Sequence, residues 1–237
     1  MSQDPSAIPA ACPMHSKESA TPAASNASPA ACPMHRGDST LKFNPDNNMP
    51  YLPNQAVNGQ DSPLSLEKVT SSIPKGNQPT GEDSSSKWEY PSPQQFYNAL
   101  VRKGYETPIE SIETMVDIHN FLNEGAWEEI LKWEKFHESE CDDPKLLRFT
   151  GKPKQLSPKA WFCSTFLGAP KPFDRHDWIV DRGGKPVRYI IDYYGGEDQS
   201  DDVPVFNLDV RPALDSISAV KDRLAVVFAD FFKKADK

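Results

Sequence analysis

The chain contains the same Cys-Pro-Met-His segment twice. PAACPMH occurs two times, letter for letter and 20 residues apart, and it places Cys12 three residues before His15 and Cys32 three residues before His35. Thiolate sulfur and imidazole nitrogen are both metal ligands, so the repeat predicts a metal-binding function. Two Cys and two His in this arrangement would complete a tetrahedral zinc site.

A second interpretation of the repeat is heme iron, for which a thiolate or an imidazole serves as axial ligand. The 16 residues between His15 and Cys32 contain no aromatic residue or leucine that could form the small core of a zinc finger. A proline follows each Cys, which disfavours the tight turn of a zinc thiolate site and directs the chain away from a bound metal. A duplicated linker without any ligand is the third interpretation.

Composition divides the chain into two parts. Residues 1–87 hold 12 of the 23 prolines and no tryptophan, whereas residues 88–237 hold all five tryptophans. Too little apolar surface is present in the first part to offset the entropy of ordering. We therefore predict a long disordered, Pro-rich segment over residues 1–87 and one folded domain over residues 88–237.

The charge and the cysteines exclude some classes of protein. The net charge is −8, which disfavours nucleic acid as a partner and suits a basic protein. No apolar run reaches the roughly 18 residues that a membrane-spanning helix needs, and the N-terminus has no secretory signal. Two of the four cysteines lie in each part of the chain, which favours free thiols over a disulfide framework.

Two helices are expected before residue 135. Ser92, followed by Pro93, is typical of a helix start, and Gly104 would end that helix. Thr107, with Pro108 behind it and a glutamate three residues on, predicts a capped second helix.

His119 falls on the apolar stripe of the expected second helix. A histidine in this position is either a hydrogen-bonded core residue or a ligand, and spacing alone leaves both open. Gly125 is predicted to interrupt the helix, so that a separate helical segment begins at Ala126.

The C-terminal part has the pattern of a β-hairpin followed by a helix. DWIVDR and VRYIIDYY are rich in strand-forming residues, and Gly183-Gly184 supplies the turn between them. His176 would open the first strand and Arg182 would close it. A further strand and an amphipathic helix from about Ser216 complete an α+β domain, a small antiparallel sheet flanked by helices.

Several stretches together resemble the holocytochrome c synthase family, also called cytochrome c heme lyases. The resemblance covers most of residues 45–223 and is carried by NMPYLPNQ, SSIPKG, WEYPSPQQFYNAL, the IHN segment, ILKWE, RFTGKP, PFDRHDWIVDR, VRYIIDYY and LDVRPALDS, together with the CPMH repeats. It implies a lyase of the mitochondrial intermembrane space, peripheral on the inner membrane. Its substrates would be ferrous heme b and apocytochrome c, or alternatively cytochrome c1.

The reaction that the resemblance implies joins each heme vinyl group to one cysteine of a Cys-x-x-Cys-His substrate, forming two thioethers. Correct placement of heme and peptide would supply most of the rate. The resemblance implies His119 as an axial ligand of the iron and Glu124 as its supporting residue. It places Trp88 and Tyr90 beside the heme face.

Four further residues receive roles from the resemblance. Arg182 would pair with a heme propionate, and His176 would assist proton transfer or position heme. Cys12 and Cys32 would be accessory heme regulatory motifs. Each of the residues in the domain has a structural alternative, packing of the core or support of the hairpin. A non-catalytic heme carrier or sensor that uses the Cys-Pro repeats is the competing function.

Overall fold

The computed structural model describes residues 51, 54–57, 59–76, 86–196 and 205–235, with side chains up to Phe228. The predictions for residues 1–50, including the Cys12 and Cys32 repeats, lie outside the described residues. In chain order the elements are β1 (Thr70–Pro74), β2 (Lys87–Glu89), α1 (Pro93–Arg102), η1 (Ile109–Ser111), α2 (Ile112–Glu134), η2 (Lys135–His137), β3 (Lys145–Gly151), α3 (Pro158–Phe166), β4 (Asp174–Arg182), β5 (Lys185–Gly195), β6 (Phe206–Pro212) and α4 (Ile217–Ala235).

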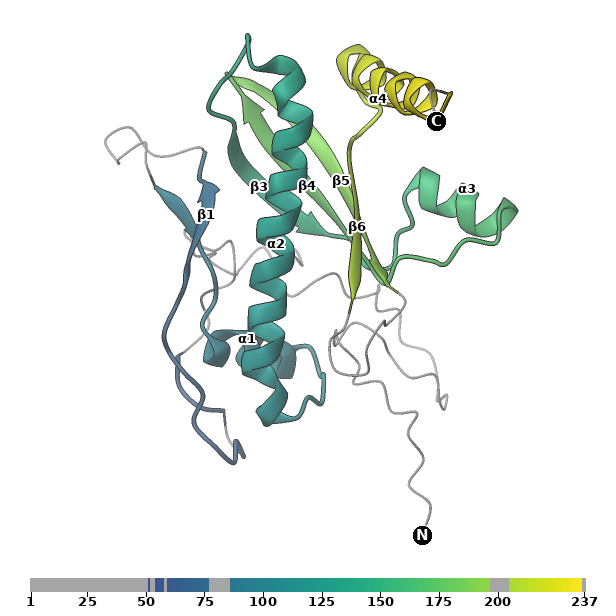
Figure 1. The fold of residues 1–237 in the computed structure, drawn as a ribbon. Helices are drawn as coiled ribbons and strands as arrows, with labels where there is room; N and C mark the ends of the chain where they lie inside the picture. The colour runs from purple at the N-terminus through teal and green to yellow at the C-terminus, as the bar shows by residue number, and fades with distance from the viewer. Residues whose placement is uncertain (1–50, 52–53, 58, 77–85, 197–204, 236–237) are drawn as a thin grey trace.

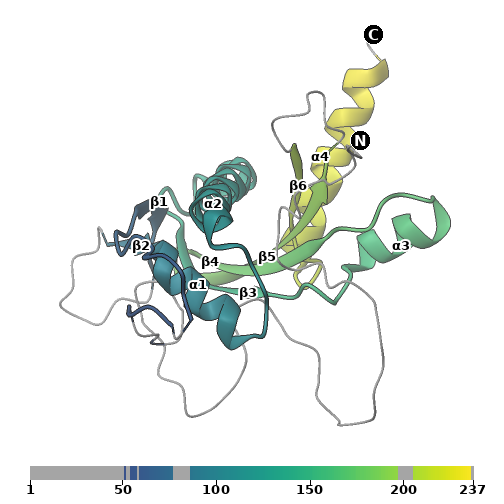
Figure 2. The ribbon, with the colours of Figure 1, turned by 90° about the horizontal axis from the view of Figure 1, so that it is seen from below.

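Two antiparallel sheets and the helices around them confirm the α+β class. The larger sheet has the order β3-β4-β5-β6, and β1 pairs with β2 in a smaller one. α2 runs along one face of the larger sheet, with the small sheet beside it (Figures 1 and 2). Within the described part of the chain, no helix has both the length and the hydrophobicity needed to cross a membrane.

Helix α1 begins and ends where its sequence predicts. Ser92 Oγ accepts a hydrogen bond from the Gln95 backbone at 3.2 Å, and Gln95 Oε1 accepts one from the Ser92 backbone at 3.2 Å. This reciprocal pair is a capping box. After the helix, Gly104 has a φ of +77°, a left-handed conformation that favours glycine.

Helix α2 differs from its prediction in two ways. A 3-10 turn, η1, comes first, and no side chain caps the start of α2 at Ser111, so the predicted capping by Thr107 is wrong. The helix also continues through Gly125 as one 23-residue element. Apolar side chains on both sides of Gly125 pack on the sheet, which outweighs the roughly 1 kcal/mol that glycine costs a helix.

The hairpin of β4 and β5 confirms its prediction, except that β4 begins at Asp174, two residues before His176. Gly183 and Gly184 have φ values of +57° and +84°, and Arg182 pairs with Lys185 across this two-residue turn. From the turn, the register runs without a bulge to the pair Asp174 and Tyr193. The expected strand and helix after it are β6 and α4, where Ser216 Oγ accepts from the Ala219 backbone at 3.1 Å.

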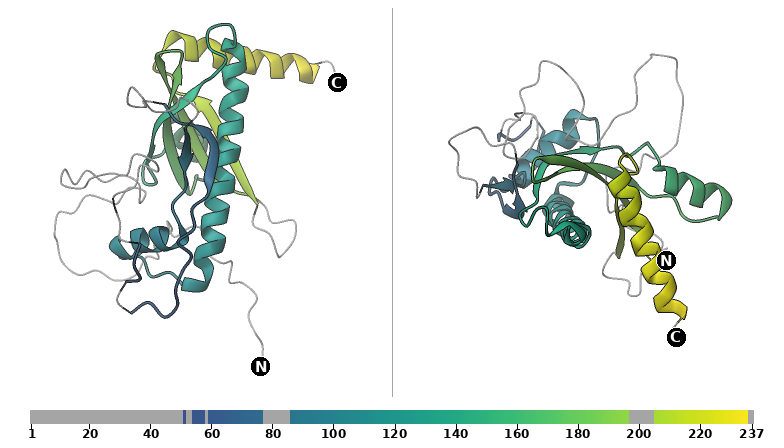
Figure 3. Two further views of the ribbon diagram at one scale, coloured as in Figure 1. Left: turned by 90° about the vertical axis from the view of Figure 1, so that its left-hand side faces the viewer. Right: turned by 90° about the horizontal axis from the view of Figure 1, so that it is seen from above.

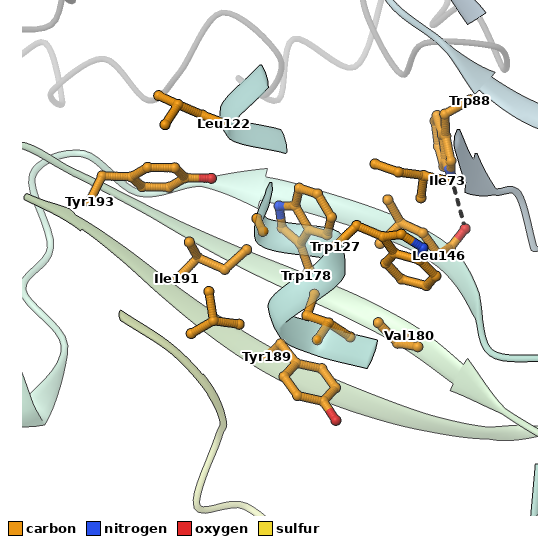
Figure 4. Close-up of a cluster of buried hydrophobic side chains, with 13 residues drawn as sticks. Ile73, Trp88, Leu122, Trp127, Leu146, Trp178, Val180, Tyr189, Ile191 and Tyr193 are labelled. Atoms are coloured by element: carbon orange, nitrogen blue, oxygen red, sulfur yellow. Dashed lines mark hydrogen bonds between the residues drawn. The ribbon is translucent and has the colours of Figure 1, made fainter. Parts of the chain in front are cut away.

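The main core lies between α2, the larger sheet and β1–β2. Figure 4 shows its side chains: Ile73, Trp88, Leu122, Trp127, Leu146, Trp178, Val180, Tyr189, Ile191 and Tyr193. Ile73 is 2 % exposed, so packing begins before residue 88. A second cluster joins α1 to the first half of α2 through Phe96, Leu100, Ile112, Met115 and Val116. α1 and α4 lie near opposite ends of α2 (Figure 3).

Candidate heme site

His119 lies in the first half of α2, beside the second core cluster. Its Nδ1 is 2.7 Å from the carbonyl oxygen of Met115, one helical turn earlier. A carbonyl only accepts hydrogen bonds, so Nδ1 carries the proton and the lone pair of the neutral ring lies on Nε2. The Phe96 ring of α1 meets the imidazole edge to face, with 5.0 Å between the ring centroids. The ring is thus held from two sides in the tautomer that suits a metal ligand.

The surroundings of His119 favour its neutral form. Burial lowers the pKa of His119 below the ordinary value of 6.5, because an imidazolium loses its hydration there. The hydrogen bond to Met115 acts in the opposite direction, the nearby His176 lowers the pKa further, and Asp174 raises it. The net result is a pKa below 6.5, so the ring is neutral at pH 7.

His176 lies within electrostatic reach of His119 and has two polar partners. Its Nε2 is 3.1 Å from Asp174 Oδ2, and its Nδ1 is 3.3 Å from the Tyr193 hydroxyl. The rings of His176 and Tyr193 meet edge to face, with 5.2 Å between centroids. When Nε2 carries the proton of the neutral ring, Nδ1 accepts from the Tyr193 hydroxyl, and the nearby Asp174 carboxylate would stabilise a second proton on the ring. This Asp174–His176–Tyr193 group can therefore hold or transfer a proton next to the neutral His119.

The sequence analysis missed Asp174 and Tyr193, although the hairpin contains the signal for both. Residues 174 and 176 share a face of β4 because side chains alternate along a strand. Counting back from the Gly183-Gly184 turn places Tyr193 directly opposite Asp174. A two-residue turn fixes this register, so the group could have been predicted from the turn alone.

Glu124 connects α2 to the small sheet and does not hydrogen-bond to His119 in the described structure. Its Oε1 accepts from the Tyr90 hydroxyl at 2.8 Å and from the Ser72 backbone at 3.0 Å, and its Oε2 accepts from the Ser72 hydroxyl. Burial and the adjacent carboxylate raise the pKa of Tyr90 well above 10, which keeps the phenol a donor. The geometry shows Glu124 and Tyr90 acting together to hold β1–β2 on the helix that carries His119.

Trp88 belongs to the main core. Its Nε1 donates to the Leu146 carbonyl at 3.1 Å (Figure 4). Its ring meets Phe149 edge to face, with 5.5 Å between the ring centroids. The Lys75 ammonium lies 5.6 Å from the centroid of the indole ring. These contacts connect the small sheet to β3, so a role of Trp88 beside a heme face stays a prediction.

Arg182 lies six residues after His176 along β4, at the other end of the strand. Its guanidinium is buried and donates two hydrogen bonds to the Glu134 carboxylate, from Nε to Oε2 at 2.7 Å and from Nη2 to Oε1 at 2.9 Å. The hydroxyl of Tyr189 also donates to Glu134. Six residues of strand span about 20 Å, so Arg182 is not part of the group around His119. Its pairing with a heme propionate stays a prediction.

The described geometry is that of an α+β domain with a neutral, partly buried imidazole on α2, near a second histidine whose partners are Asp174 and Tyr193. Among the described residues, no cluster of three or more His, Cys, Asp or Glu side chains could hold a metal ion by itself. An iron that already has ligands of its own, as heme has, fits a single imidazole better than a bare cation does.

Comparisons with known proteins identify the family. The family model described as cytochrome c/c1 heme lyase matches residues 1–227. The chain is 46 % identical to the holocytochrome-c synthase of Saccharomyces cerevisiae, over 90 % of this chain and 84 % of that protein. It is 48 % identical to the holocytochrome c-type synthase of Bos taurus, over 78 % and 67 %. No solved structure matches.

The chain belongs to the cytochrome c/c1 heme lyase family, and it is a lyase that attaches heme to apocytochrome c. A putative holocytochrome-c1 synthase of Schizosaccharomyces pombe is also similar, at 46 % identity over 64 % of this chain and 69 % of that protein. The family expected from the sequence, the enzyme class and heme as substrate are therefore confirmed.

Proposed function

We propose that this enzyme binds ferrous heme b through His119 Nε2 and holds it while apocytochrome c supplies two cysteine thiols to the heme vinyl groups. The observation that carries this assignment is the donation of His119 Nδ1–H to the Met115 carbonyl, in surroundings that lower the pKa of the ring. A ligand must offer a lone pair, and a protonated imidazole has none. The histidine of the substrate Cys-x-x-Cys-His would occupy the opposite axial position.

Each addition conserves atoms and electrons. The cysteine S–H is consumed, a new carbon–sulfur bond forms at one vinyl carbon, and the other vinyl carbon gains the hydrogen. We assign the acceptance and return of that proton to His176, because the Tyr193 hydroxyl hydrogen-bonds to its Nδ1 and the Asp174 carboxylate, 3.1 Å from its Nε2, stabilises a positive charge on the ring. Glu124 and Tyr90 act at a distance, by holding the small sheet on α2. Positioning of heme against the peptide contributes most of the remaining rate.

The expected location is the mitochondrial intermembrane space, with peripheral attachment to the inner membrane. The eukaryotic relatives support this proposal. Both cytochrome c and cytochrome c1 are substrate candidates, since relatives named for each match the chain.

Coexpression with apocytochrome c, in a bacterium without its own maturation system, tests the function directly. We expect heme that stays with the cytochrome on a denaturing gel. A substrate whose two heme-attachment cysteines are replaced by serine should carry no heme on the gel. This control shows that the heme signal reports thioether bonds. If the enzyme purifies with heme while the intact substrate remains unlabelled, the protein is a heme carrier and the proposal fails.

The Cys-Pro repeats should be dispensable for the chemistry. We expect the double variant Cys12→Ala/Cys32→Ala to form thioethers at the wild-type rate when purified heme is in excess, because a thiolate outside the domain does not orient a vinyl group. A lower yield is expected only when heme is limiting, since the proposed role is loose capture. Complete loss of product with excess heme would show that the repeats belong to the catalytic site.

A further inference from the structure

Helix α3 exposes an aromatic cluster that the heme chemistry does not use. Trp161, Phe162, Phe166 and the following Leu167 are each more than half exposed. The Phe166 ring packs against both other rings, with centroid distances of 5.8 Å to Trp161 and 5.1 Å to Phe162. Only one residue of α3, Ala160, is buried. The cluster is therefore preformed, and its outer surface faces away from the core.

Polar contacts fix the first turn of α3 to the sheet. Ser157 caps the helix by accepting from the Ala160 backbone at 3.1 Å, and its hydroxyl also donates to Asp192 at 2.5 Å. Arg211 donates to the same hydroxyl at 2.7 Å. The rest of the helix projects beyond the sheet on the side away from α1 (Figures 1 and 2). A nine-residue helix is too short to be stable by itself, so these contacts hold it in place.

The charge around α3 is opposite to that of the whole chain. Residues 151–173 contain four lysines and no acidic residue, in a protein of net charge −8. Lys152 and Lys159 pair with acids of the sheet, Asp177 at 2.6 Å and Asp209 at 2.7 Å. The other two lysines, at positions 154 and 171, are exposed on either side of the helix. A local excess of positive charge favours an anionic surface.

We infer that α3 docks on an anionic phospholipid bilayer, with its aromatic cluster in the headgroup region and the exposed lysines against the lipid phosphates. Tryptophan and phenylalanine beside lysine are the composition of helices that lie at a membrane surface. Helix α3 is short and projects from the sheet, a shape that suits insertion into a deformable lipid surface better than binding in a protein groove. The inference names the surface that would carry the proposed membrane attachment, and it requires no heme.

Cosedimentation of the full chain with vesicles tests the inference. We expect wild-type protein to bind phosphatidylcholine vesicles that contain phosphatidylglycerol, and to bind pure phosphatidylcholine much more weakly. The double variant Phe162→Ser/Phe166→Ser should bind anionic vesicles at least about tenfold more weakly, because the two lost side chains together remove about 1.4 kcal/mol or more of apolar burial. Phe136→Ser is the matched control: Phe136 is 56 % exposed and lies on η2, and its loss should leave binding unchanged.

A second variant tests the two exposed lysines beside α3. Lys154→Gln/Lys171→Gln should weaken binding at low salt and make it less sensitive to salt, since exposed charges are screened. The inference is overturned if the wild type does not bind anionic vesicles, if both lipid mixtures bind it equally, or if Phe136→Ser weakens binding as much as the α3 variant does. Thioether formation in vesicle-free solution should be unchanged in the α3 variant. Loss of that activity with normal vesicle binding would identify α3 as a site for the protein substrate instead.

Discussion

Replacement of His119 by alanine is expected to abolish the low-spin heme spectrum of the purified enzyme and to reduce thioether formation by more than about 100-fold. The expected loss exceeds the 10- to 100-fold effect typical of residues that only support a metal ligand, because the ligand itself is removed. Alanine is the best helix former, so α2 should remain intact. Absorption spectroscopy of bound heme and a denaturing-gel assay of the product measure the two effects separately.

Two further variants distinguish a lost ligand from a damaged site. Asp117→Ala changes an exposed residue two positions earlier on α2 and should leave heme binding unchanged. His119→Gly should regain the low-spin spectrum when free imidazole is added, since the small molecule can occupy the space of the missing ring. If the alanine variant retains heme and forms thioethers at the wild-type rate, His119 is not the ligand.

Acid should release His119 from the proposed heme complex only at a pH below the ordinary histidine pKa of 6.5. Protonation removes the lone pair of His119, and its pKa lies below 6.5 chiefly because burial disfavours the charged ring. Ligation is therefore fully present at neutral pH and is lost as the pH falls through this lowered pKa. A spectrophotometric pH titration of the heme complex should show a midpoint below 6.5.

Breaking the buried pair of Arg182 and Glu134 should cost about 3–5 kcal/mol of unfolding free energy. Both side chains are about 5 % exposed or less, and Arg182→Met leaves the Glu134 carboxylate buried without its cation. Burial of Tyr189 beside that carboxylate raises the tyrosine pKa, so its hydroxyl stays a donor but supplies no positive charge. Urea unfolding followed by tryptophan fluorescence measures the loss.

A matched exposed pair and a double variant complete the experiment. Lys185 and Glu140 form an exposed ion pair of 3.1 Å at the same hairpin, and Lys185→Met should leave the unfolding free energy almost unchanged. The double variant Arg182→Met/Glu134→Leu should recover much of the lost stability, because no unpaired charge remains. A recovered stability with no thioether formation would show that Arg182 also contacts heme, the role that the resemblance implies.

The hairpin was predictable because its determinants are local. Gly183-Gly184 suits the two-residue turns that join antiparallel strands, and a turn of this length sets the register of every pair up to Asp174 and Tyr193. Helix α1 was predictable for the same reason, since Ser92, Pro93 and Gly104 act within the helix ends. These elements require no information from distant residues.

Tertiary contacts decided the elements that the sequence did not predict. Gly125 is a helix-weakening residue locally, but a β-carbon at this position would lie 3.5 Å from Leu208 of β6, so the helix passes close to the sheet there. β1 and β3 are joined by the Gly76 backbone, which donates to the Leu146 carbonyl at 2.9 Å. Only the packed fold brings these distant segments together.

The site was predictable at His119 and His176 only through the resemblance, because spacing did not distinguish a ligand from a core histidine. The partner of Glu124 required the structure, since Ser72 is 52 residues away in the chain. For Arg182, the sequence and the structure lead to different conclusions. An arginine after a strand appears solvent-exposed in the sequence, but a carboxylate from α2 reaches it in the fold.

Helix α2 belongs to both hydrophobic cores, with His119 beside the second cluster and Glu134 at the far end of the helix, bonded to Arg182 of β4. The backbone that carries His119 therefore cannot move away from the proposed position of the iron unless packing contacts in both cores loosen. We expect the finished cytochrome to leave when the bond between the iron and His119 weakens, or when loops around the heme move. The position of His119 itself would not change. The rate of product release would then depend on how far the newly attached porphyrin distorts, because that distortion is a property of the product that could weaken the iron–nitrogen bond.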